Sequence, residues 1–175
     1  MSKRLPSEKT ALKLLTQAGC SKNVIEHCKE VADFAVEIAE ACKEKKFKVN
    51  VDLVRVGALL HDVGRAKTHS VDHSIVGAQI ARERNLSDAI VSIIERHVGG
   101  GITENEAKKL GWPLKSYVPE SIEERIVAYA DKLIEGSMQV PVEVAVERLH
   151  QDKNVPEDAI RRFKQWHKEF SICLM

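Results

Sequence analysis

The sequence predicts an all-α protein, a single-domain helical bundle of the 175 residues 1–175. Apolar residues recur at steps of three and four in almost every segment, and no segment alternates with the period of two that a β-strand requires. The chain contains no internal repeat and no linker-like stretch. Hydrophobic residues make up 43% of it, which is enough to bury one substantial core.

Two amphipathic helices are expected at the start of the chain. The first covers residues 7–18 and ends at Gly19, and the second begins after Ser21. His27 lies at the edge of the apolar face of the second helix. That face consists of residues spaced alternately by four and three: Val24, Cys28, Val31, Ala35, Ile38 and Cys42.

The central helix is nearly all apolar over residues 54–60 and runs into the pair His61-Asp62, which Gly64 follows. Asp52 is expected to cap its start. A helix that is apolar on all sides belongs in a core, so the pair should lie at the end of a buried rod. An unpaired buried carboxylate costs several kcal/mol, and a bound cation would remove that cost.

The next two helices each place a histidine on an inward face. Asp72 is expected to cap the first, with His73 and Ile80 on one side. Ser87 is expected to cap the second, with His97 in line with its isoleucines, and glycines 99–101 end it. A short helix over residues 103–110 and a loop over residues 111–119 follow.

The C-terminal part is expected to contain three more helices. Ser121 and Glu124 form a capping-box pattern before a helix that carries Asp131 beside its apolar face. Two helices near residues 142–150 and 156–170 come last. We therefore expect a core of about residues 23–136, with C-terminal helices over residues 141–171 packed on it.

Six residues on inward faces or helix ends carry imidazole or carboxylate groups. This is the donor set preferred by Mn, Fe, Co, Ni or Zn. A single inward histidine is more often a hydrogen-bonded core residue, but six together favour a site for one or two divalent transition metals. They meet only if five helices pack around one centre, with Asp62 able to bridge two ions. The predicted ligands are His27, His61, Asp62, His73, His97 and Asp131.

The order of these residues resembles the HD superfamily of metal-dependent phosphohydrolases. The string 61–64 (His-Asp-Val-Gly) is similar to that family's His-Asp-Ile-Gly, and residues 73–78 resemble its His-Ser-x-x-Gly-Ala helix start. Residues 130–132 (Ala-Asp-Lys) resemble its closing element. The likeness covers residues 23–136. It implies that His27, His61, Asp62 and Asp131 bind one metal, and that His73 and His97 add a second.

The resemblance implies hydrolysis of a phosphoester, as a phosphomonoesterase or phosphodiesterase, on a nucleotide or related small molecule. Asp62, Arg65 and Lys67 are the expected catalytic residues, and Arg65, Lys67, Arg96 and Lys132 the expected phosphate contacts. The chain lacks the His-His-Glu and closely following Gly-Tyr-Pro pattern of cyclic-dinucleotide phosphodiesterases, which argues against such substrates. Two alternatives stay open: a di-iron oxygenase of the HD type, and a nucleotide-binding regulatory module without turnover.

Composition limits the partners. A net charge of +1 gives no strong indication of nucleic-acid binding, and no stretch has the length and apolarity of a membrane span or signal peptide. The four cysteines are scattered and are expected to be reduced thiols, as in a cytoplasmic protein. The sequence leaves the oligomeric state open.

Overall fold

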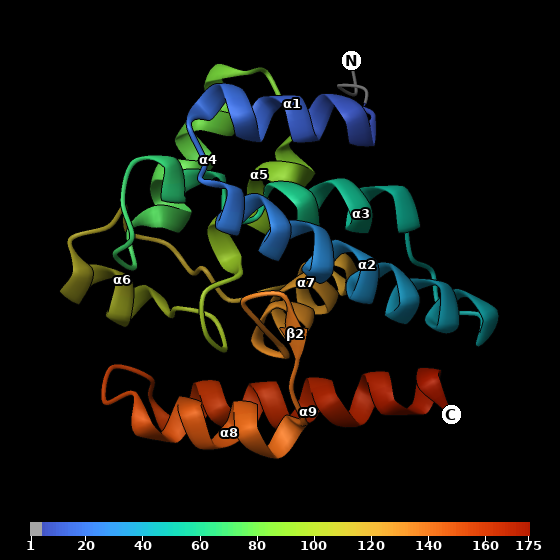
Figure 1. Ribbon diagram of the computed structural model, residues 1–175. Helices are drawn as coiled ribbons and strands as arrows, with labels where there is room; N and C mark the ends of the chain where they lie inside the picture. Colours follow the sequence, from blue (N-terminus) through green and yellow to red (C-terminus); the bar gives the residue numbers. More distant parts are fainter. Residues whose placement is uncertain (1–4) are drawn as a thin grey trace.

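The structure, a computed structural model, describes residues 5–175. Within this range the chain is mostly helical, which confirms the all-α prediction (Figure 1). Nine α-helices, one 3-10 helix (η1) and two short strands follow one another in this order: α1 (Glu8–Ala18), α2 (Lys22–Glu44), α3 (Val51–Leu60), η1 (Val63–Ala66), α4 (His73–Glu83), α5 (Asp88–Arg96), α6 (Glu104–Leu110), α7 (Ile122–Lys132), β1 (Ile134–Glu135), β2 (Met138–Gln139), α8 (Val142–Gln151) and α9 (Glu157–Leu174).

The core forms where α2, α3, α5 and α7 pack together. The predicted apolar face of α2 is buried, with Cys28, Val31 and Ile38 all inaccessible to solvent. Helix α3 is buried along most of its length, as its composition predicts. The central position of α3 places its C-terminal end, where His61 and Asp62 follow, inside the protein.

Helices α8 and α9 lie side by side and form a layer against α2 and α7 (Figure 1). Phe163 and Phe170 of α9 are fully buried, and both rings lie 5.4 Å from the ring of Tyr129 on α7. Within residues 5–175, none of the helices combines the length and hydropathy that a membrane crossing needs.

Several predicted helix starts carry the expected cap, and three differ. The hydroxyl groups of Ser21 and Ser87 accept the predicted bonds from backbone N–H groups. Asn50, not Asp52, caps α3, because the helix begins at Val51 and leaves Asp52 inside its first turn. Asp72 makes no capping bond, and its carboxylate instead accepts a hydrogen bond from Trp112 Nε1 at 2.7 Å.

At the start of α7, only half of the predicted capping box forms. The Ser121 hydroxyl accepts from the backbone N–H of Glu124. The Glu124 carboxylate, however, accepts from the backbone N–H of Glu120 and from Arg96 rather than from the N-cap residue.

The expectation that strands are absent is wrong at one point. Strands β1 and β2 form an antiparallel hairpin in which Ile134 is opposite Gln139. Each strand has two residues, which is too short to show an alternating pattern in the sequence.

The expectation of four reduced cysteines is also wrong, because Cys42 and Cys173 form a disulfide. Their 131-residue separation hides the pair in the sequence, and the packing of α9 along α2 brings their Cα atoms to 4.7 Å. Cys20 and Cys28 are free. Cysteine usage therefore gives no support to the expected cytoplasmic location.

Candidate metal centre

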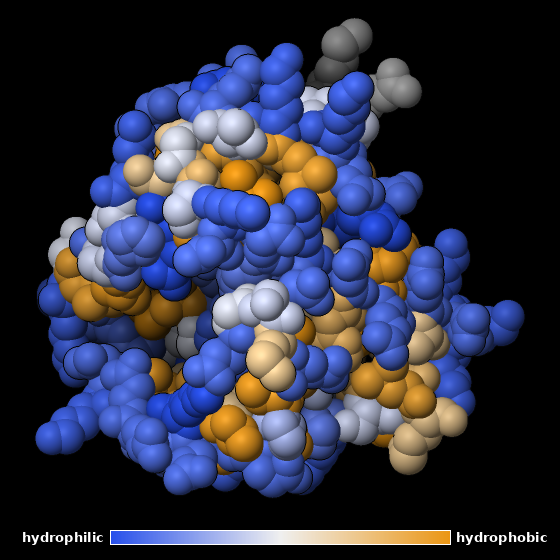
Figure 2. Space-filling model, viewed as in Figure 1, coloured by the Kyte–Doolittle hydropathy of each residue, from blue (hydrophilic) through white to orange (hydrophobic). Residues whose placement is uncertain are grey.

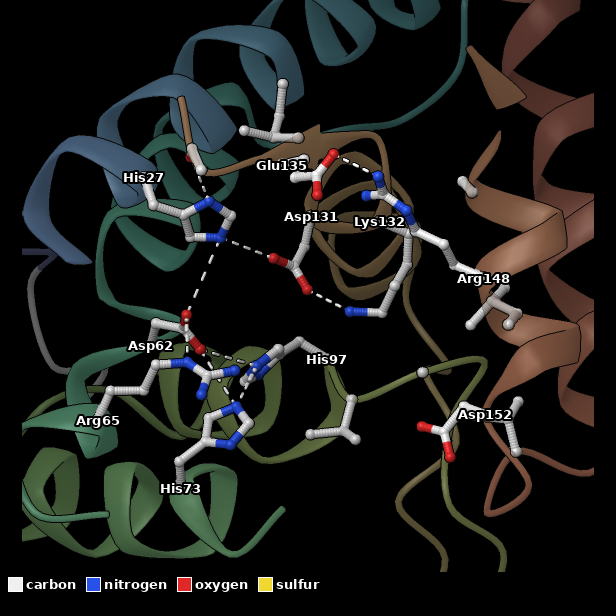
Figure 3. A pocket seen from close by; sticks show the side chains of 17 residues that line it. His27, Asp62, Arg65, His73, His97, Asp131, Lys132, Glu135, Arg148 and Asp152 are labelled. Atoms are coloured by element: carbon white, nitrogen blue, oxygen red, sulfur yellow. Dashed lines mark hydrogen bonds and ion pairs between the residues drawn. The ribbon is translucent and has the colours of Figure 1, made fainter. Parts of the chain in front are cut away.

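All six predicted ligand residues converge at one place in the bundle (Figure 3). His27 comes from α2 and Asp131 from α7. The other four lie at helix ends: His61 and Asp62 after α3, His73 at the first position of α4, and His97 directly after α5. The latter four side chains are buried.

The carboxylate of Asp62 lies between two groups of imidazoles. Its Oδ1 is 3.2 Å from Nε2 of His73 and 3.3 Å from Nε2 of His97. Its Oδ2 is 3.6 Å from Nε2 of His61 and 3.9 Å from Nε2 of His27. Because each oxygen faces a different pair of rings, this carboxylate has the position of a bridging ligand.

Asp131 completes the group on the Oδ2 side. Its Oδ1 lies 3.0 Å from Nε2 of His27 and 3.2 Å from Nε2 of His61. Two triads have ligand atoms within 4.8 Å of one another: His27, His61 and Asp131, and His61, Asp62 and His97. His61 belongs to both.

Every one of the four imidazoles donates its Nδ1–H to a backbone carbonyl. The acceptors are Gly136 O for His27 (2.8 Å), Ala58 O for His61 (2.6 Å), Ser70 O for His73 (2.7 Å) and Ile94 O for His97 (2.7 Å). In a neutral ring this bond leaves the lone pair on Nε2, and it also fixes the ring orientation. All four Nε2 atoms are therefore prepared as ligands.

Nε2 of His27 is bonded to Oδ1 of Asp131, but other inward-facing atoms of the cluster are poorly satisfied. Nε2 of His73 and Nε2 of His97 are 3.0 Å apart, so two lone pairs face each other when both rings are neutral. Nε2 of His61 and Oδ1 of Asp62 are buried without a hydrogen-bond partner. Leaving such atoms unsatisfied costs about 1–3 kcal/mol each. A divalent transition metal fits this donor set and would satisfy them.

The electrostatics of the cluster favour ionised carboxylates. Burial raises the pKa of Asp62, but the charge of His61 and the nearby imidazoles of His73 and His97 outweigh it and hold that pKa well below its usual range. Burial also raises the pKa of Asp131, but the positive charges of Lys132 and His61 outweigh it and hold that pKa well below its usual range.

The pKa values of the fully buried imidazoles of His61 and His97 shift in opposite directions. Burial lowers the pKa of His97 to about 4. Burial also acts to lower the pKa of His61, but nearby Asp62 and the other acidic groups raise it well above the ordinary value.

Two glycines set the distance between Asp62 and His73. A Cβ on Gly64 would lie 1.8 Å from the carbonyl oxygen of His73 and 2.6 Å from the backbone nitrogen of Gly77. A Cβ on Gly77 would in turn lie 3.1 Å from the nitrogen of Gly64. At Gly64 only glycine allows η1 and α4 to approach this closely, and at Gly77 an added Cβ would also crowd the side chain of Ile94 at 2.9 Å.

The cluster opens into a cavity of about 470 Å³ that two of the four predicted phosphate contacts line. Arg65 donates from Nε to Oδ2 of Asp62 at 2.7 Å, and Lys132 pairs with Asp131. Lys67 and Arg96 do not line it. Lys67 is exposed, and Arg96 instead pairs with Glu120 and Glu124 at 3.2 and 3.1 Å.

Helix α8 supplies cavity residues that sequence reasoning missed. Arg148, Leu149 and Asp152 line the side opposite the histidines, and Arg148 pairs with Glu135 of the hairpin (Figure 3). Arg148 and Leu149 lie in the last turn of α8 and Asp152 directly follows the helix, but nothing in the sequence indicates that this end of α8 meets the cluster.

Residues 24–136 match the HD domain family, and the chain belongs to this family. Helices α8 and α9 lie beyond the matched segment.

Relatives with curated names differ in length. An uncharacterised protein of Methanocaldococcus jannaschii is 45% identical over 155 residues, covering 89% of this chain and 92% of its own length. A tRNA (cytidine(56)-2′-O)-methyltransferase of Thermoplasma volcanium is 43% identical over 98% of this chain, which spans only 49% of that protein. A ribonuclease Y of Pseudothermotoga lettingae is 32% identical over 91% of this chain and 28% of its own length.

Solved structures support the same fold. The HD domain of the L. monocytogenes phosphodiesterase PgpH, in complex with cyclic-di-AMP, aligns with a TM-score of 0.57 over 90% of this chain and 92% of that domain. The sequence identity is 17%, so the likeness concerns the fold alone.

Proposed function

We propose that this protein is a metal-dependent phosphohydrolase that acts on a nucleotide or a related phosphoester. The observation that carries the proposal is the set of four imidazoles, each with Nδ1 bonded to a carbonyl and Nε2 turned toward the carboxylate of Asp62, of Asp131 or of both. We propose His27, His61, Asp62, His73, His97 and Asp131 as the ligands. A bound metal would supply an activated water at neutral pH and offset charge on the phosphate.

Arg65 has the position of a phosphate contact. Its Nε is bonded to Asp62, which orients the guanidinium at the edge of the cavity. Among residues 5–175, its Nη2 has no hydrogen-bond partner and remains free to donate to a phosphate oxygen. Lys132 lies on the Asp131 side and would add a second positive charge. We do not propose roles for Lys67 or Arg96, since neither lines the cavity.

The names of the relatives support a nucleotide or RNA-derived substrate. Ribonuclease Y and the tRNA methyltransferases are named for RNA, and the PgpH domain was solved with a cyclic dinucleotide. Since this chain corresponds to about half of the methyltransferases, and its cavity is built around metal-type ligands, we do not extend methyl transfer to it.

The test begins with metal content by mass spectrometry on protein purified without chelator or nickel. Protein loaded with Mn, Fe, Co, Ni or Zn is then assayed on phosphomonoesters and phosphodiesters, with Asp62→Ala as the inactive control. We expect one or two metals per chain and metal-dependent release of phosphate or alcohol. Oxygen uptake with iron and no hydrolysis would favour the oxygenase, and nucleotide binding without product would favour the regulatory module.

A further inference from the structure

A second cavity of about 450 Å³ adjoins the metal-type cavity. The two share four lining residues, namely Val98, Gly99, Asp152 and Val155. Both volumes lie in the range of about 300–1,000 Å³ that small-molecule sites occupy. The second cavity lies where the loop after His97 and the C-terminal end of α6 face the turn between α8 and α9. On this face, Figure 2 shows a hollow between α6 and the α8–α9 layer, with hydrophobic side chains gathered beside it.

The walls of the second cavity are apolar and uncharged over most of their area. Its hydrophobic lining consists of Val71, Val98, Ile102, Leu110, Val155, Pro156 and Ala159. No Lys, Arg or His lines it, whereas the first cavity has its histidines and three cations, Arg65, Lys132 and Arg148, each paired with a carboxylate. A phosphate therefore favours the first cavity, and a neutral group with apolar faces favours the second.

A few polar groups lie among these apolar walls. The backbone N–H groups of Gly99 and Gly100 have no partner within residues 5–175. The side-chain amide of Asn154 also lines the cavity, and amides of this kind pair with the edges of nucleobases. Apolar walls with a few hydrogen-bonding groups suit a nucleobase, whose faces are apolar and whose edge is polar.

Asp152 lies at the junction of the two cavities, on the far side from Asp62 (Figure 3). Its Oδ1 accepts a hydrogen bond from the backbone N–H of Asn154 at 2.9 Å, and its Oδ2 has no partner in the described chain. A carboxylate in such a place would repel a second phosphate. It can accept hydrogen bonds from the hydroxyl groups of a ribose, as acidic residues do in dinucleotide sites.

The loop between the cavities is held in a fixed position by α9. Arg162 donates from Nε to the carbonyl of Gly100 at 2.6 Å and from Nη2 to that of Gly101 at 3.2 Å. A Cβ on Gly100 would lie 2.0 Å from the carbonyl oxygen of Ala159, so only glycine fits against α9 here. The cavity wall is thus formed before any ligand arrives.

We propose that the second cavity binds the nucleoside of a substrate whose phosphate lies in the first cavity, with the ribose at Asp152 and the base between Val98, Ile102 and Leu110. This assignment rests on the proposed function and narrows its substrate class to nucleoside phosphoesters. In this assignment the turn between α8 and α9 and the start of α9, which lie outside the family match, contribute one wall of the nucleoside site.

The test compares two diesters that release the same 4-nitrophenol: the 4-nitrophenyl ester of thymidine 5′-phosphate and methyl 4-nitrophenyl phosphate. Leu110→Asp introduces a charge into the second cavity at a side chain that is 41% exposed, so folding should survive. Leu114→Asp is the matched control, since Leu114 is 65% exposed and lines neither cavity. We expect Leu110→Asp to raise KM for the thymidine ester at least tenfold, with the methyl ester and the control variant changing less than twofold. An equal change with both esters, or none, would overturn the proposal.

A binding measurement separates this inference from the proposed function. Equilibrium dialysis of adenosine 5′-monophosphate against metal-free protein needs no turnover, and Leu110→Asp should raise Kd at least tenfold. Asp152→Asn should weaken adenosine 5′-monophosphate more than its 2′-deoxy analogue. Binding that follows this pattern without hydrolysis of any ester would refute the proposed function alone. If the protein hydrolyses the esters but neither Leu110→Asp nor Asp152→Asn changes the Kd for adenosine 5′-monophosphate, the nucleoside site alone would be refuted.

Discussion

Replacing Gly64 by alanine should damage one half of the ligand cluster and spare the other. The added Cβ would lie 1.8 Å from the carbonyl oxygen of His73, where ordinary contacts begin at 3.4 Å. The start of α4 would therefore have to move by about 1.6 Å. The obstacle is backbone at both close contacts, so no side-chain rotation relieves it. Since His73 is the first residue of α4, its imidazole moves with the displaced backbone.

The expected cost follows from overpacking. Forcing a methyl group into a filled interior destabilises by about 1–3 kcal/mol, which corresponds to a fall in Tm of about 2–12 °C for a chain of this size. His73 now lies 3.2 Å from Oδ1 of Asp62, and a shift of this size removes it from ligand range. His27, His61 and Asp131 come from α2, the end of α3 and α7, so we expect the variant to keep the metal that they bind and lose the other.

Gly57→Ala is the matched control in the same buried region. Its Cβ would meet Cδ1 of Ile93 at 2.5 Å, which is the end of a flexible side chain. Alanine is also the better helix former by about 1 kcal/mol in the interior of α3. Metal content by mass spectrometry and urea unfolding of metal-free protein give the two readouts, each relative to the wild type. If Gly64→Ala matched the wild type in metal content and in stability, the role proposed for the close contact between Gly64 and the start of α4 would be wrong.

Three further results are expected. Asp62→Ala should lose metal and hydrolysis together, because its two oxygens face both groups of imidazoles; retained activity would exclude Asp62 as a ligand. Nearby acidic groups hold the pKa of His61 above its ordinary value, so metal must displace a proton there. Metal affinity should then fall about tenfold per pH unit below that pKa, and calorimetry in buffers of different protonation enthalpy should detect the proton released; no release at pH 7 would contradict this. Cys173→Ser should lower the free energy of unfolding by up to about 5 kcal/mol, because the bond to Cys42 closes a loop of about 131 residues. The metal content of Cys173→Ser should equal that of the wild type. As the control, its unfolding midpoint should equal that of the wild type after reduction of the disulfide. If the midpoint instead equalled that of the oxidised wild type, the disulfide would be ruled out.

The sequence predicts best those features that produce a pattern among residues close together in the chain. The helices follow from apolar spacing, since each buries one face. The six cluster residues are found because a polar group on an apolar face is costly unless something satisfies it. Taken singly, His27 or His97 would be interpreted as a hydrogen-bonded core residue, and only the six residues together indicate a site.

What the sequence leaves out depends on contacts between distant segments. Arg96 is the last residue of α5 and directly precedes His97, yet its guanidinium pairs with Glu120 and Glu124 and not with the cavity. Helical spacing does not predict this pairing. Cys42 and Cys173 sit on helices that meet only after the bundle forms. The contribution of α8 to the cavity could not be predicted either, because helical periodicity identifies the apolar face of a helix but not the segment that this face contacts.

The spread of the cluster along the chain has a consequence for biosynthesis. His27 and Asp131, which touch at 3.0 Å, are 104 residues apart in sequence. A growing chain exposes His27 first and cannot complete either side of the cluster until later helices have been made and packed. Residues 61–97 contain the ligands on the Oδ1 side of Asp62, but the side formed by His27 and Asp131 is complete only when α7 has been made, so the full set of ligands exists only in the finished protein. Any ion it takes up then favours the folded form by mass action, and the extent of metal loading reports how much of the newly made protein has matured.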